Sequence, residues 1–182
     1  MKRSMVTLAV MLSAVLVAGC GGYNSGPGSI TSQTSEVSDC GGFAKQGDAL
    51  FDVDPAYCQA EMLLWQYDQG SATLRLANTR VLLNCCGDHS VKIEEQEDFY
   101  LVTERDAPES QAGGARCSCM CVFDFSIEAA GISTGVIRLQ LVRQVTDDAD
   151  SSGVIFDGEL DLTAGSGSIV IDDTDVYPWC GE

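Results

Sequence analysis

Apolar and polar residues alternate with period two in several stretches of this 182-residue chain, and this alternation predicts β-strands. The clearest stretch is Cys117 to Ile127, whose odd positions are cysteine, phenylalanine or isoleucine and whose even positions are mostly polar. One face of this strand, with all three of its cysteines, is therefore expected in a core. The same alternation recurs in Val136 to Val145 and in Val154 to Leu162, and Ser168 to Ile171 is expected to pair with the latter.

Turn residues predict two hairpins in the first half of the chain. Asp68-Gln69-Gly70 separates Glu61 to Tyr67 from Ala72 to Cys85, where the buried parity changes near Asn78-Thr79 and so predicts a bulge. A helix over Pro55 to Leu64 is an alternative for the first arm.

The second hairpin is expected to join Val91 and Ile93 to Phe99–Thr103 through a Glu-rich turn, and a polar loop is expected over Asp106 to Gly114. Seven or eight short strands separated by turns favour an all-β fold, an antiparallel β-sandwich of the Ig-like kind.

The N-terminus has the features of a secretory signal. Met1-Lys2-Arg3 precedes an apolar run, Met5 to Ala18, that is too short for a permanent membrane span. The run ends in Leu16-Val17-Ala18-Gly19-Cys20, which resembles the lipobox of bacterial lipoproteins. The resemblance implies cleavage before Cys20 and lipidation of its sulfur. An ordinary signal peptide with an incidental cysteine is the alternative.

Three segments follow from these features: a signal peptide over 1–19, the lipidated cysteine with a flexible linker over 20–39, and one domain over 40–182. The linker is rich in Gly, Ser and Thr and lacks apolar periodicity, so we expect a disordered tether. In the lipoprotein family, an Asp after the lipidated cysteine retains the protein at the inner membrane. Gly21 therefore implies an outer-membrane location in a cell that has one.

The mature chain is strongly acidic. After residue 19 there are eight basic and 27 acidic residues, a formal charge of −19. Such a surface repels nucleic acid and favours cations or basic partners, but we favour plain solubility in an envelope over any role in steering partners.

Eight cysteines remain after Cys20, and an even number in an exported domain indicates disulfides. They are Cys40, Cys58, Cys85, Cys86, Cys117, Cys119, Cys121 and Cys180. We expect Cys85 and Cys86 to pair with two of the three cysteines at 117, 119 and 121, across the two sheets. Because neighbours on a strand point to opposite faces, a bend before Gly87 is needed. The third cysteine would then pair with Cys180 or Cys58, and Cys40 would close the ends.

The body of the chain also resembles a family of uncharacterised exported bacterial proteins. The resemblance rests on Asn84-Cys85-Cys86 and on Cys-Ser-Cys-Met-Cys followed by Phe-Asp-Phe, and it covers about residues 72–145. It is consistent with the sandwich and implies no known activity.

Two patterns are candidate ion sites. Asp148, Asp150, Ser152 and Glu159 fit the spacing of an EF-hand calcium loop, with Gly153 and Ile155 at its glycine and apolar positions. The flanking residues alternate like strands, however, so a polar hairpin tip is the competing interpretation. The clustered cysteines are soft ligands of the kind that copper or zinc prefers, but thiols this close become disulfides in an oxidising envelope.

No pattern indicates catalysis. The only histidine, His89, is expected in a loop beside Asp88, and the chain has neither a nucleophile motif nor Cys-x-x-Cys. We therefore expect a non-enzymatic, lipid-anchored structural or interaction module of the cell envelope. It would contact the membrane through its anchor and a protein of the envelope, without a cofactor. An ion-binding envelope protein, using calcium or a soft metal, is the alternative.

Overall fold

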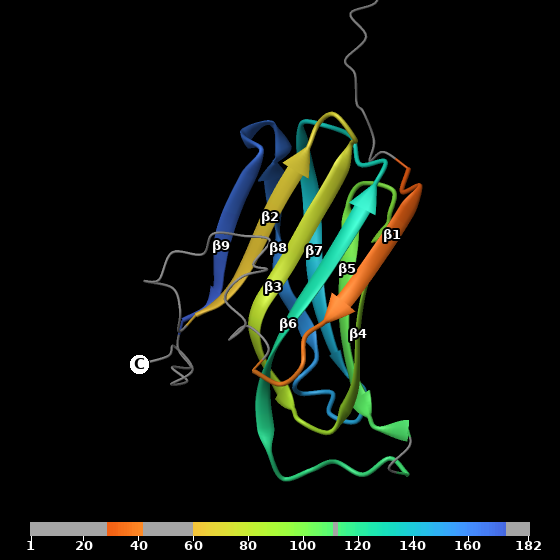
Figure 1. Cartoon of the computed structure of the whole chain (residues 1–182), viewed down its shortest axis with the longest axis vertical. Helices are drawn as coiled ribbons and strands as arrows, with labels where there is room; N and C mark the ends of the chain where they lie inside the picture. The colour runs from red at the N-terminus through yellow and green to blue at the C-terminus, as the bar shows by residue number, and fades with distance from the viewer. Residues whose placement is uncertain (1–28, 42–59, 111–112, 174–182) are drawn as a thin grey trace, which may run out of the picture.

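Two β-sheets pack face to face in the computed structural model, which describes residues 29–41, 60–110 and 113–173 (Figure 1). The described residues form nine strands and one short 3-10 helix: β1 (Ser32–Val37), β2 (Glu61–Asp68), β3 (Thr73–Asn84), β4 (Gly87–Glu95), β5 (Tyr100–Pro108), β6 (Met120–Ala130), β7 (Val136–Val145), β8 (Gly153–Asp161), η4 (Leu162–Ala164) and β9 (Ser166–Asp172). The signal peptide, Cys20, Cys58 and Cys180 lie outside the described residues.

The sheets have the strand orders β1-β6-β3-β2-β9 and β4-β5-β7-β8. In Figure 1 the five-stranded sheet lies in front of the four-stranded one. The predicted fold class, a β-sandwich, is confirmed, although the described strands number nine rather than seven or eight. All strand pairs are antiparallel except β5 with β7, which run parallel because β6 crosses to the other sheet between them.

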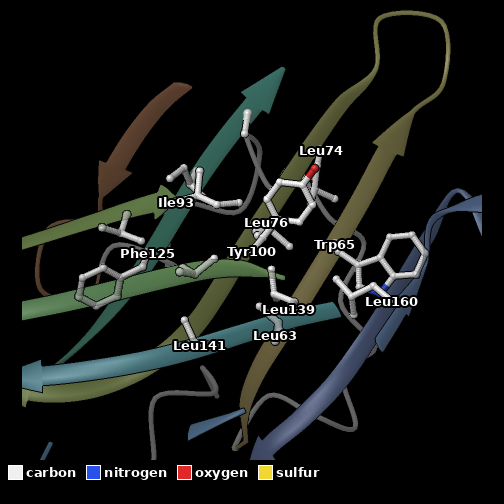
Figure 2. Packing of buried hydrophobic residues seen from close by; sticks show 14 of the residues in the cluster. Leu63, Trp65, Leu74, Leu76, Ile93, Tyr100, Phe125, Leu139, Leu141 and Leu160 are labelled. Atoms are coloured by element: carbon white, nitrogen blue, oxygen red, sulfur yellow. The ribbon is translucent and has the colours of Figure 1, made fainter. Parts of the chain in front are cut away.

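The apolar core lies between the sheets, as Figure 2 shows. Trp65 and Leu76 reach into it from the five-stranded sheet, and Tyr100 and Leu139 reach into it from the four-stranded one. Both predicted hairpins form, β2 with β3 and β4 with β5, and the predicted bulge interrupts the β3/β6 register between Asn78 and Val81. Because Glu61 begins a strand, the alternative helix ending at Leu64 is wrong.

Part of the predicted linker is a strand. Ser32–Val37 forms β1 and pairs antiparallel with β6 along its whole length. Its side chains are largely exposed, so the sequence carries no apolar alternation there. The backbone hydrogen bonds to β6 stabilise this edge strand, and such bonds leave little signal in residue type.

The last two strands do not pair with each other, contrary to the prediction. β8 pairs with β7, whereas β9 pairs with β2 in the other sheet. Between them, η4 buries Leu162 and ends at Gly165, whose φ of +80° suits glycine. This turn carries the chain from one sheet to the other.

Three disulfides gather at the end of the sandwich that contains the bend between β3 and β4. Cys85 pairs with Cys119 and Cys86 with Cys117, with Cα atoms 5.8 and 5.4 Å apart. This confirms the prediction that both pair with members of the 117, 119 and 121 set. The bend at Cys85 and Cys86 directly before Gly87 is also confirmed. Cys121, however, pairs with Cys40 and not with Cys58 or Cys180.

The disulfides do not cross between the sheets, which corrects a further expectation. Their cysteines flank or lie on β1, β3 and β6, which are neighbours in the five-stranded sheet. Asn84 and Met120 are the last pair in the β3/β6 register, so the next residues, Cys85 and Cys119, face each other directly. Because β6 begins only at Met120, Cys121 alone of the 117–121 cysteines lies buried in the core.

The core predicts a large difference between two substitutions on β7. Leu141→Ala should lower the free energy of unfolding by about 2–5 kcal/mol, because it removes a fully buried side chain between the sheets. Val136→Ala, at a position 61% exposed on the same strand, should change it by less than about 0.5 kcal/mol. Urea denaturation of the oxidised protein measures both, and equal losses would contradict this placement of the core.

Candidate functional site

Charged residues replace the apolar core at one end of the sandwich interior. The inward side of β5 carries Tyr100, Val102, Glu104 and Asp106 in that order, and all four are buried. Glu104 is 1% exposed and Asp106 is 2% exposed. Because unpaired buried charges are costly, the partners of these carboxylates define the candidate site.

Glu104 belongs to a network that joins the two sheets, here called the Arg143 network: Glu61, Asn78, Glu104 and Arg143. The Arg143 guanidinium lies between both carboxylates, with Nη2 3.1 Å from Glu104 Oε2 and also bonded to Glu61 Oε1. The Asn78 amide donates to Glu61 Oε1 and to Glu104 Oε1, at 2.8 Å each. Glu61 and Asn78 come from the five-stranded sheet, and Glu104 and Arg143 come from the four-stranded one.

Two local features of the backbone bring these residues together. The parallel register of β5 and β7 places Glu104 beside Arg143. On the opposite sheet, the bulge after Asn78 leaves Arg80 with a φ of +62°, and the Arg80 amide donates to Asp124 Oδ1 at 2.8 Å. Because of the bulge, the side chains of Asn78 and Val81 both point into the sandwich, although the two residues are an odd number of positions apart.

The Arg143 network has more acid than base. Burial raises the pKa of Glu104 to about 7, against the attraction of Arg143 and the hydrogen bond from Asn78, and the nearby Glu61 raises it further. Burial lowers the pKa of Arg143, but the two glutamates outweigh it and raise that pKa overall. Near neutral pH the network therefore takes up or releases a proton at Glu104 while Arg143 stays charged.

A second group, here called the His89 cluster, comprises the buried side chains of His89 and Asp106, the partly exposed Arg116 and the exposed Asp147. Arg116 binds Asp106 through Nη1, and its Nε donates to Asp147 Oδ2 at 3.0 Å. His89 Nε2 is 3.3 Å from Asp106 Oδ1, yet it has no hydrogen-bond partner among the described residues. Asp106 thus has a guanidinium on one side and an imidazole on the other.

His89 packs against aromatic rings inside the core. Its ring centroid is 4.3 Å from that of Phe123 and 6.4 Å from that of Phe125. Burial lowers the pKa of His89, and Arg116 lowers it further, whereas Asp106 and a hydrogen bond to the backbone of Asn84 act the other way. The imidazole is therefore neutral at neutral pH.

Gly87 allows the His89 cluster to close. A Cβ atom at this position would lie 2.5 Å from Asp106 Oδ1 and 2.8 Å from His89 Nε2. Real side chains do not approach this closely, so only glycine fits beside the carboxylate and the imidazole.

Three residues of the predicted calcium loop, Asp148, Asp150 and Ser152, share one turn, but Glu159 does not join them. The Asp148 carboxylate accepts hydrogen bonds from the Asp150 amide and the Ser151 hydroxyl, and the Ser152 hydroxyl bonds to Val145. Glu159 lies on β8 opposite Arg138, about 20 Å along the strand from this turn. Calcium binding there stays a prediction that this geometry does not support.

The cysteine cluster offers no thiolate for copper or zinc. The five cysteines between 85 and 121 are all in disulfides, and a disulfide sulfur lacks the charge of a thiolate ligand. In the described part of the chain, no three His, Cys, Asp or Glu side chains are arranged to hold a metal ion.

Sequence reasoning placed His89 in a loop and did not single out Glu104, Asp106 or Arg143. The sequence did carry a sign of their burial, because two of these residues occupy the same alternate positions as apolar residues of their strands. His89 shares parity with Val91 and Ile93, and Arg143 shares parity with Leu139 and Leu141. A charged or titratable residue at an inward position of a strand indicates a buried polar group, provided that the strand's length is known.

Searches of protein-family models, curated proteins and solved structures found nothing that matches this chain. The disulfides themselves indicate an oxidising compartment, outside the cytoplasm. No helix among the described residues has the length and apolar character needed to cross a bilayer.

Glu104 predicts an unusual pH dependence of stability. Its pKa is about 7 in the folded protein and 4.5 in the unfolded one, so the folded state binds more protons between these values and loses stability as the pH rises. The loss amounts to about 3 kcal/mol. In urea denaturation at pH 4.5 to 7.5, Glu104→Gln should remove this contribution and leave the opposite one from His89, whose pKa is lowered by burial. Glu94→Gln, at an exposed position on β4, should retain it, and an unchanged slope in Glu104→Gln would contradict the assignment.

The turn at Asp148 predicts that calcium has no effect on stability. The melting temperatures in millimolar calcium and in a chelator should agree within about 1 °C, because the carboxylate is already bonded within its own turn. Differential scanning calorimetry measures this. A rise of several degrees in the wild type that is absent from Asp148→Asn would instead establish a calcium site.

Proposed function

We propose that this protein is exported, anchored to a membrane by acyl chains on Cys20, and serves as a structural or interaction module of the cell envelope without catalytic activity. Its sandwich would be displayed on the tether that precedes β1. The outer membrane is the proposed location where the cell has one, because Gly21 follows the lipidated cysteine.

The observation that carries this proposal is the set of three disulfides at one end of a single domain. Such bonds form and persist in oxidising compartments, which is where a lipobox signal would deliver the chain. The excess of acidic residues supports solubility in the envelope and favours a basic protein surface as the partner.

The buried charges support a non-catalytic role. Glu104 and His89 have perturbed pKa values, which are frequent in active sites. Both are enclosed by partners from the two sheets, and the His89 side chain is only 7% exposed. A substrate would have to open the sandwich to reach either group, so we assign them to the stability of the fold.

Lipidation is tested by metabolic labelling with an alkyne fatty acid, followed by membrane fractionation. The wild type and the linker variant Ser25→Ala should be labelled and should sediment with the outer membrane, whereas Cys20→Ala should be unlabelled. Gly21→Asp should keep the label but move to the inner membrane. A labelled Cys20→Ala protein, or an unlabelled wild type in the soluble fraction, would refute the anchor.

A further inference from the structure

Arg116 reaches the His89 cluster from a segment without regular structure. Residues 115–119, directly before β6, belong to no strand or helix. Two bridges attach them to the fold, Cys117 to Cys86 directly beside Arg116 and Cys119 to Cys85 two residues further on, together with the Asn84 side chain and the hydrogen bond from the Cys85 amide to the Cys119 carbonyl. The Asn84 amide donates to the Cys117 carbonyl at 2.8 Å, and the Cys86 amide donates to Asn84 Oδ1 at 3.0 Å. The residue next to the disulfide is therefore the one that neutralises Asp106.

The imidazole of His89 is placed to take over that role. Its ring donates a hydrogen bond to the backbone of Asn84, which leaves Nε2 as the unprotonated nitrogen. Nε2 is buried, has no hydrogen-bond partner among the described residues, and lies 3.3 Å from Asp106 Oδ1. A proton on Nε2 would give this atom a donor and the carboxylate a cation.

Burial is the main reason that the pKa of His89 is lowered, Asp106 opposes it, and Arg116 is the cation that adds to it. On β4 itself, Asp88 is exposed and adds a weak attraction for a proton. From β5 comes Asp106, and β6 contributes the rings of Phe123 and Phe125. Asp147, in the turn after β7, acts on the cluster through its bond to Arg116.

We propose that the Cys86–Cys117 disulfide controls the charge of His89. With the bridge intact, Arg116 neutralises Asp106 and His89 is neutral. With the bridge reduced, Arg116 leaves the carboxylate, and His89 binds a proton and replaces it. The protein would then couple the redox state of its surroundings to proton uptake in its core, independently of the membrane anchor.

The redox step is ordinary thiol chemistry. A dithiol reductant breaks the S–S bond and supplies two electrons and two protons, which yield the thiols of Cys86 and Cys117 and the cyclic disulfide of the reductant. Protonation of His89 follows from solvent, because a buried carboxylate without a cation raises the proton affinity of the imidazole beside it.

The single histidine makes the test direct, because NMR titration of its ring signals in the full chain reports one pKa. Cys86→Ser with Cys117→Ser should raise the pKa of His89 by about one or more, a tenfold gain in proton affinity. Cys85→Ser with Cys119→Ser, the matched control, removes the neighbouring bridge and should leave that pKa unchanged. Arg116→Gln, with every bridge intact, should reproduce the rise.

An unchanged pKa in the Cys86/Cys117 variant overturns the proposal, and so does an equal rise in the Cys85/Cys119 control. If the Cys86/Cys117 variant loses the circular dichroism signal of folded strands, Arg116→Gln decides. An unchanged pKa of His89 in that variant refutes the exchange of cations on which the proposal rests, and a raised one supports it.

Discussion

The ion network around Arg143 joins the two sheets where the apolar core ends. Among the described disulfides, Cys40–Cys121 and Cys85–Cys119 lie beside or on strands of the five-stranded sheet, and Cys86–Cys117 lies at the bend before β4, so none of the three joins facing strands of the two sheets. Arg143 instead binds Glu104 on its own sheet and Glu61 on the opposite one. Because loss of one partner leaves an uncompensated buried charge, such a network is costly to break, by about 3–5 kcal/mol. It also fixes how the sheets face each other, since both carboxylates must reach one guanidinium.

The disulfides stabilise the fold in a different way. They join residues 81, 34 and 31 positions apart in the chain. In the chain-entropy account, each such bond lowers the conformational entropy of the unfolded chain and so stabilises the folded state by about 4 kcal/mol. They also hold irregular segments in place. The bridge at Cys117 lies directly beside Arg116, which binds Asp106, and the bridge from Cys40 attaches the segment after β1 to β6. At this end of the molecule, disulfides hold the irregular segments, whereas ion pairs join the two sheets.

The buried ionisable groups respond to pH in opposite directions. The raised pKa of Glu104 favours the folded state at low pH, whereas the lowered pKa of His89 favours it at higher pH. Both groups are enclosed, and neither needs a ligand to explain it.

Local patterns in the sequence were enough to predict the all-β class, the two hairpins around Asp68 and Glu95, the bulge after Asn78 and the bend at Cys85-Cys86. Each of these depends on local alternation or on turn residues, which a single segment displays. Three features could be seen only in the folded protein: the pairing of Cys121 with Cys40, the strand at Ser32–Val37 and the separation of β8 from β9. These features depend on which segments become neighbours, and a polar edge strand or a glycine turn looks the same with either partner. The charged interior belongs to the second group as well, since Glu104 and Arg143 are tolerable in a core only because the parallel register of β5 and β7 brings them together.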